Sequence, residues 1–143
     1  AWQAAARDHP NVAVRIGYDE ALSHRMIAGA DAIIVPSRFE PCGLTQLYGL
    51  RYGAVPVVAL TGGLADTIIP ANDAAQKAGC ATGIQFNPVD LAALRDALMR
   101  LGDLYRDGPA WSALQRNAMR HPVGWDLSAA RYAEVYRELA GVK

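Results

Sequence analysis

The sequence has few residues of the kinds that build metal centres or disulfide-linked scaffolds. It contains two cysteines, Cys42 and Cys80, far apart in the chain, and only three scattered histidines. No C-x-x-C pair occurs, so we expect no metal site. The two cysteines could form one disulfide, but two reduced thiols in a cytoplasmic protein are the favoured interpretation.

Net charge and long apolar segments are also absent. Fourteen basic residues balance fourteen acidic ones, which gives no support for binding nucleic acid or a membrane surface through bulk charge. The sequence has no signal peptide and no apolar run of about 18 residues, so we expect no membrane span. Neither the G-x-G-x-x-G dinucleotide fingerprint nor a P-loop occurs, which leaves these two phosphate-binding motifs unsupported.

What is present indicates one folded domain over residues 1–143. Hydrophobic residues make up 52% of the chain and charged residues 20%, which is typical of a chain with a real core. The first seven residues, Ala1–Arg7, have the pattern of a helix already under way, without an initiating Met or a cap. We therefore expect the chain to be a fragment of a larger protein.

Short apolar runs alternate with amphipathic segments along the sequence. Runs rich in β-branched residues predict strands at 12–16, 32–35, 55–59 and 83–86. Pro56 suggests that its strand either starts there or lies at an edge of the sheet. Cap residues and helical spacing predict helices at about 20–28, 44–52, 64–69, from Asp90 onward, 109–119 and 126–140. Residues 70–82, small and polar, are predicted to form a surface loop.

This alternation predicts an α/β fold with a Rossmann-like, doubly wound parallel sheet, incomplete at its N-terminus and followed by a helical C-terminal segment. Such sheets bind ligands at the carboxyl ends of their strands. Three loops occupy that position, at residues 17–19, 36–43 and 61–63. We expect them to line one crevice.

The loop between Pro36 and Gly43 carries the most informative candidate, Glu40. A helix start offers unpaired backbone N–H groups to an anion, and a nearby carboxylate can hold sugar hydroxyls. Glu40 could also be a solvated loop acid or a partner of the helix dipole. Pro41 and Gly43 constrain the loop around it, which favours a functional role.

Other candidates have ordinary structural explanations as well. Gly62–Gly63 could expose amides to a phosphate or simply form a tight turn. Tyr18 could stack on a nucleobase or pack at a strand end. Thr45 could contact a phosphate or cap its helix. Arg38 is expected to form a structural ion pair rather than meet a phosphate.

Two further residue types are assigned structural roles. Cys42 is a weak candidate nucleophile, because no histidine is near it in sequence and a small residue suits a tight turn. Trp111 and Trp125, both on predicted helices, are expected to be core anchors rather than ligand platforms.

Taken together, these motifs resemble the bacterial glycogen synthases. The resemblance is strong over about residues 12–67 and looser through 83–86 and Trp125. Its carriers, in order and spacing, are Ile16–Glu20, Gly29–Asp31, Pro36–Gly53 and Thr61–Thr67. The string SRFEPCGLTQ, at Ser37–Gln46, is long and specific.

The resemblance implies a retaining GT-B glycosyltransferase, related to the starch synthases, in which two Rossmann-like lobes close over a nucleotide sugar without a metal or other cofactor. Such enzymes transfer glucose from ADP-glucose to the non-reducing end of an α-1,4-glucan. This chain would be part of the C-terminal lobe, with the sheet and donor-site loops in about 1–88 and the C-terminal helices in 89–143. Its partner would be the N-terminal lobe of the same enzyme.

By resemblance, Glu40 matches the family's essential acid near the glucose 3-hydroxyl. The turn whose amides meet the sugar and phosphate corresponds to Cys42, Gly43 and Leu44. Thr45 matches a phosphate contact, Tyr18 the residue that stacks on adenine, and Gly62 and Gly63 the double-glycine turn that faces the donor.

Two departures from the wider GT-B pattern matter. Many GT-B enzymes carry a second Glu eight positions after the first, where this chain has Tyr48, as the glycogen synthase branch allows. The basic residues that hold the diphosphate lie upstream in the family, so we expect the fragment alone to be inactive. Another GT-B enzyme that uses a different nucleotide sugar, or a non-catalytic Rossmann-like binding module, stays an alternative.

Overall fold

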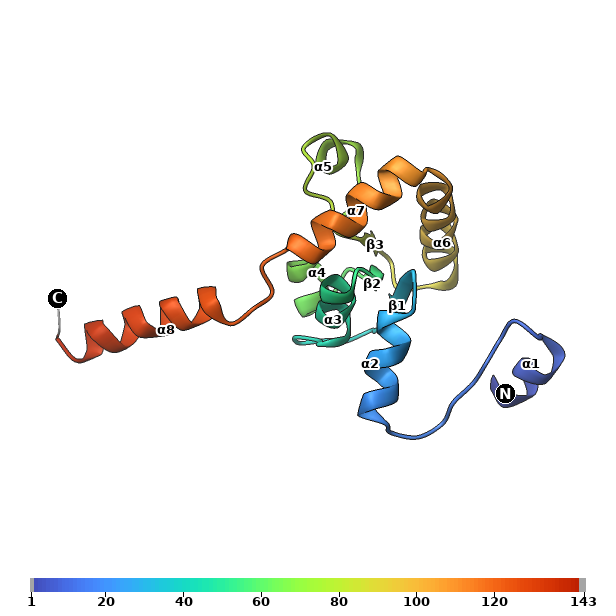
Figure 1. Ribbon diagram of the computed structural model, residues 1–143, viewed down its shortest axis with the longest axis horizontal. Helices are drawn as coiled ribbons and strands as arrows, with labels where there is room; N and C mark the ends of the chain where they lie inside the picture. The colour runs from blue at the N-terminus through green and yellow to red at the C-terminus, as the bar shows by residue number, and fades with distance from the viewer. Residues whose placement is uncertain (1, 142–143) are drawn as a thin grey trace.

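The computed structural model describes residues 2–141, in which helices surround a small parallel sheet (Figure 1). Its strands are β1 (Ala32–Val35), β2 (Val55–Ala59) and β3 (Ile84–Phe86). Its helices are α1 (Trp2–Asp8), α2 (Glu20–Ala28), α3 (Thr45–Tyr52), α4 (Gly62–Thr67), α5 (Asp73–Lys77), α6 (Leu91–Arg106), α7 (Gly108–Arg120) and α8 (Asp126–Leu139). The predicted alternation of strands and helices is confirmed from α2 to α6.

The sheet has the order β1-β2-β3, and both strand pairs are parallel. Ala32 lies opposite Val55, and Val57 lies opposite Ile84. Helix α3 packs against β1 and β2, whereas α6 packs against β3 and β2. The predicted parallel α/β architecture is therefore confirmed, and the loops after β1 and β2 leave the same edge of the sheet.

The core is centred on β2, all of whose residues are buried. A continuous apolar run is what a central parallel strand requires, because both of its faces are covered. Leu50 of α3, Leu64 of α4 and Ile84 of β3 are fully buried in the same cluster. This packing holds the ends of β1 and β2 in fixed relative positions.

Pro56 is the second residue of the central strand, so a strand start is confirmed and an edge position is wrong. The Val55 N–H donates to Asp31 O on the β1 side. Because successive residues of a strand face opposite neighbours, the Pro56 nitrogen faces the β3 side. There the ladder begins one residue later, at Val57, so the missing N–H costs no strand-pairing bond.

The strand predicted at 12–16 is absent from the structure. That segment has no regular structure, and Ile16 is 71% exposed. Residues 13–17 and residues 32–34 of β1 line one cavity of about 760 Å³, and β1 pairs with β2 instead of with this segment. A β-rich run becomes a strand only where a neighbouring backbone takes up its N–H and C=O groups, and no described segment does so here.

The surface loop predicted at 70–82 is partly wrong, because it contains helix α5. Asn72 caps this helix by accepting a hydrogen bond from Ala75 N at 2.9 Å. Ala71, Ala75 and Ala81 are buried in a second apolar cluster around Trp111. The small residues of this segment pack beside the large indole ring of Trp111. Their small size and polar neighbours resemble the composition of a loop, which explains the wrong prediction.

The two tryptophans differ in environment. Trp111 is 7% exposed, which confirms a core anchor, whereas Trp125 is 68% exposed, so the same prediction for it is wrong. Trp125 precedes α8, which projects away from the body of the molecule and has no buried residue (Figure 1). Its ring stacks on Tyr132, with the ring centroids 5.7 Å apart.

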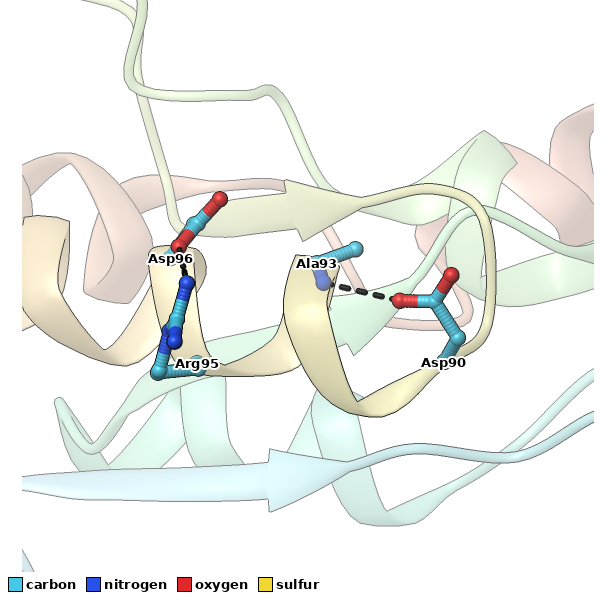
Figure 2. Close-up of polar contacts among 4 residues, drawn as sticks. All are labelled: Asp90, Ala93, Arg95 and Asp96. Carbon is cyan, nitrogen blue, oxygen red and sulfur yellow. Dashed lines mark hydrogen bonds and ion pairs between the residues drawn. The ribbon is translucent and has the colours of Figure 1, made fainter.

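Helix starts follow the predicted caps. Asp19 accepts a bond from Leu22 N at 2.9 Å at the start of α2. Asp90 accepts from Ala93 N at 2.8 Å at the start of α6, as Figure 2 shows. The same figure shows Arg95 paired with Asp96 at 3.4 Å on the exposed surface of α6.

These two aspartates, six positions apart on one helix, give a matched test of stability. Asp90→Ala should lower the free energy of unfolding by about 1 kcal/mol, because the Ala93 N–H loses its acceptor. Asp96→Ala should change it by less than about 0.5 kcal/mol, because an exposed ion pair contributes little. Urea denaturation measures both values, and an equal loss in the two variants would contradict the cap assignment.

Candidate functional site

Glu40 lies in the loop between β1 and α3, and its carboxylate is anchored within that loop. Ser37 donates its hydroxyl to Glu40 Oε2 over 3.1 Å. Both side chains are half-buried, although Phe39 beside Glu40 is 81% exposed. A carboxylate has several acceptor sites, so this bond orients Glu40 and leaves it able to accept from a ligand hydroxyl.

The turn that follows Glu40 leads into the start of α3. Gly43 has φ 75°, in the left-handed region that favours glycine. Leu44 is the N-cap residue of α3, and no side chain caps this helix start. The first backbone N–H groups of α3 are therefore available for an anion, which the positive end of the helix dipole also favours.

The double-glycine turn after β2 meets this loop backbone to backbone. Gly63 N donates to Glu40 O at 3.0 Å. A Cβ on Gly62 would collide with Glu40 O, and one on Gly63 with the backbone of Cys42. Only glycines allow this approach, and two of the three loops expected to line one crevice therefore lie together. The Gly63 amide is already bonded within the protein and is not free for a phosphate.

The third predicted loop, at residues 17–19, lines a cavity without Glu40, Gly62 or Gly63, so the expectation that all three loops share one crevice is not borne out. Gly17 and Asp19 line the same cavity as Thr45, at the start of α3. Tyr18 is 90% exposed. Among residues 2–141, it is not one of those that line that cavity. The structure thus brings Glu40 and Cys42 into direct contact with Gly62 and Gly63, with Gly43 next in the chain, and leaves Tyr18 open to solvent.

Several alternatives for single residues are settled by their contacts. The cap role of Thr45 is wrong, because it is the first helical residue and Leu44 holds the cap position without a side-chain bond. The ion pair expected for Arg38 is absent within residues 2–141, where the salt bridges join Arg95 to Asp96 and Arg106 to Asp103. Cys42 and Cys80 are free, exposed thiols, so the disulfide alternative is wrong. Ligand contacts of Thr45 and Cys42 stay predictions.

For three polar residues of the site, Ser37, Gln46 and Thr67, the sequence predicted no role. Ser37 lies three positions before Glu40, and Gln46 three positions after Gly43. Such spacings are typical of short-range hydrogen bonds from side chains at turns and helix starts, and they could have indicated the roles of Ser37 and Gln46. Thr67 has such a spacing to Gly63, four positions earlier, but nothing local pointed to its contact with Gln46, 21 positions away.

Residues 2–141 hold no group of three or more His, Cys, Asp or Glu that could bind a metal ion. They also contain no helix with the length and apolar character needed to span a bilayer.

Comparison with known proteins identifies close relatives, although no family model matches the chain. A glycogen synthase of Cereibacter sphaeroides is 71% identical over 90% of this chain, which spans 27% of that protein. A glycogen synthase of Paracoccus denitrificans is 62% identical over 98% of the chain and 30% of its own length. The chain thus spans less than a third of the curated relatives it matches.

A solved structure shows the same relationship in three dimensions. The catalytic domain of starch synthase IV from Arabidopsis thaliana, bound to ADP and acarbose, superposes with a TM-score of 0.86 at 36% identity. The match covers 94% of this chain and 28% of that one. Sequence identity above 60% over nearly the whole chain and this shared fold lead to one conclusion: the chain belongs to the glycogen synthase family.

Proposed function

We propose that the protein carrying this chain transfers glucose from ADP-glucose to the non-reducing end of an α-1,4-glucan, with retention of anomeric configuration. This chain supplies the donor-binding part, and the rest of the protein supplies the acceptor side. The observation that carries the proposal is the meeting of the Glu40–Leu44 loop and the Gly62–Gly63 turn at one edge of the sheet. The relative bound to ADP and acarbose supports the ligand class.

Within this proposal, Glu40 accepts a hydrogen bond from a glucose hydroxyl and stabilises positive charge that develops at the anomeric carbon. Its bond from Ser37 presents the carboxylate in one orientation before the sugar arrives. The electrostatic gain is greatest for a group that needs no rearrangement during the reaction. Glu40 acts on the sugar without becoming covalently attached to it.

The diphosphate would be held by backbone groups of this chain. The amides of Cys42, Gly43 and Leu44 lie at the uncapped start of α3, and the Thr45 hydroxyl begins the helix. Gly62 and Gly63 bring the second turn close enough to close the other side of the site. Tyr18, exposed at the start of α2, is the proposed stacking partner of adenine.

The proposed transfer uses no metal ion or other cofactor. The leaving nucleoside diphosphate is stabilised by the α3 amides and by basic side chains from outside this chain. We expect the chain alone to be inactive, because it spans 27% of a full-length relative. The proposed location is the cytoplasm, where the exposed thiols of Cys42 and Cys80 would stay reduced.

Donor choice tests the proposal directly. The complete protein, incubated with glycogen, should have a kcat/KM for ADP-glucose at least about tenfold higher than for UDP-glucose. Release of ADP or UDP measures both values. NMR of the extended glucan should show α-linked glucose. A preference for UDP-glucose would indicate another GT-B enzyme, and no release from either donor would indicate a non-catalytic module.

Glu40 gives the sharpest test by mutation. Glu40→Gln in the complete protein should lower kcat at least about 100-fold, because the amide keeps the shape of the side chain and loses its charge. Glu138→Gln, on exposed α8, is the control with the same chemical change and should leave kcat within about twofold. Steady-state kinetics with ADP-glucose measures both, and near-normal turnover of Glu40→Gln would remove Glu40 from the mechanism.

Ser37 should show a smaller effect through Glu40. Ser37→Ala removes the bond that orients the carboxylate, so kcat should fall by about three- to tenfold while Glu40 keeps its charge. Ser37→Thr retains a hydroxyl and should recover most of the loss. The loss should disappear when Ser37→Ala is combined with Glu40→Gln, and additive losses would contradict the coupling.

A further inference from the structure

Gln46 is a fully buried polar residue at the start of α3, directly behind the loop of Glu40. Its exposed fraction is 0%, which is unusual for a glutamine. Its Nε2 lies 3.0 Å from Cys42 O and 2.9 Å from Gly43 O, and it donates to both. The amide thus closes the turn by binding the carbonyl groups of the two peptide bonds that flank Gly43.

The same amide reaches the second turn through Thr67. Gln46 Nε2 lies 3.3 Å from Thr67 Oγ1, and the Thr67 hydroxyl donates to Gly63 O. A side-chain amide has two N–H groups, and this one faces three acceptors, so one N–H is shared. The longest of the three contacts, to Thr67 Oγ1, is the weakest. A continuous path of hydrogen bonds nevertheless runs from the Cys42–Gly43 turn, through two side chains, to the Gly62–Gly63 turn.

The space around Gly43 depends on this arrangement. A Cβ on Gly43 would lie 2.5 Å from Gln46 Oε1 and 3.0 Å from Nε2, so the amide fills the volume that a side chain would occupy. Gln46 Oε1 is buried and has no hydrogen-bond partner within the described residues. A buried polar group of this kind is costly, so apolar packing alone does not explain the glutamine.

We propose that Gln46 and Thr67 are positioning residues, which set the spacing between the Glu40–Leu44 loop and the Gly62–Gly63 turn for binding the nucleotide sugar. The inference rests on the proposed function for its substrate. Neither side chain needs to touch that substrate. Each acts through backbone groups of the two turns, whose separation decides whether Glu40 and the α3 amides meet the donor together.

Two substitutions in the complete protein test the link from its two ends. Thr67→Val keeps a β-branched shape and removes the hydroxyl, and Gln46→Met keeps the side-chain length and removes both donors. Thr67→Ser restores the hydroxyl and is the rescue. Gln85→Met is the matched control, because Gln85 Nε2 donates to Ala65 O and Ile68 O at 3.0 and 2.7 Å and so holds the end of α4 beside Thr67 without bonding either turn.

The first readout needs no catalysis. The Gly63 amide, which donates to Glu40 O, should exchange its hydrogen with D2O at least about tenfold faster in Thr67→Val and Gln46→Met than in the parent protein. Exchange in Thr67→Ser and Gln85→Met should stay within about twofold of the parent. Unchanged exchange in both Thr67→Val and Gln46→Met would overturn the link between the turns.

The second readout is kinetic. Thr67→Val should lower kcat/KM for ADP-glucose by about tenfold and leave the KM for glycogen within about twofold. Thr67→Ser and Gln85→Met should retain the parent kcat/KM. Equal losses in Thr67→Val and Gln85→Met would mean general destabilisation and overturn the positioning role.

The two readouts separate this inference from the proposed function. A parent protein that turns over neither ADP-glucose nor UDP-glucose refutes the proposed function, and the exchange of the Gly63 amide still decides whether Gln46 and Thr67 join the turns. If the parent is active, faster exchange with unchanged kcat/KM refutes the positioning role alone.

Discussion

The close approach of two backbone segments, Glu40–Cys42 and Gly62–Gly63, is the constraint on which the site depends. The segments follow adjacent parallel strands, β1 and β2, and meet without intervening side chains because residues 62 and 63 have none. The bond from Gly63 N to Glu40 O fixes the contact at 3.0 Å. Buried β2 holds the strand ends in place, and the position of Glu40 therefore depends on the packing of the core.

This dependence explains which parts of the fold could be predicted from sequence. β1 and β2 were predictable because each is an uninterrupted apolar run, although β2 is buried throughout and β1 only partly, with Ile34 48% exposed. The segment 12–16 has an equally β-rich composition but lies unpaired beside a cavity. A strand forms only when a second segment lies beside it to take up its backbone hydrogen bonds, and the composition of one segment does not show whether such a neighbour exists.

Some residues of the site could likewise be predicted from the sequence, and others could not. Glu40, Gly43 and the double glycine were predictable because turn chemistry is local, and each occurs just after a strand. Burial of Gln46 was not, because a glutamine in the first turn of a helix usually faces solvent. In the folded chain its amide contacts Cys42 O, Gly43 O and Thr67 of α4, and the last of these contacts joins residues 21 positions apart. Trp125 is the converse case, since a residue type that usually packs inside here stays exposed.

The neutral net charge of the chain restricts how it can bind an anionic donor. Fourteen positive and fourteen negative side chains produce no strong overall field, so attraction must come from groups placed within a few ångströms of the phosphates. The uncapped start of α3 provides such groups, because its first N–H donors have no side-chain acceptor. A backbone donor is useful only where the backbone is held, and here the holding falls to Gln46, through the carbonyls of Cys42 and Gly43. The glutamine behind the turn and the open amides in front of it are therefore two parts of one arrangement, in which a buried side chain gives a short loop the rigidity that anion binding requires.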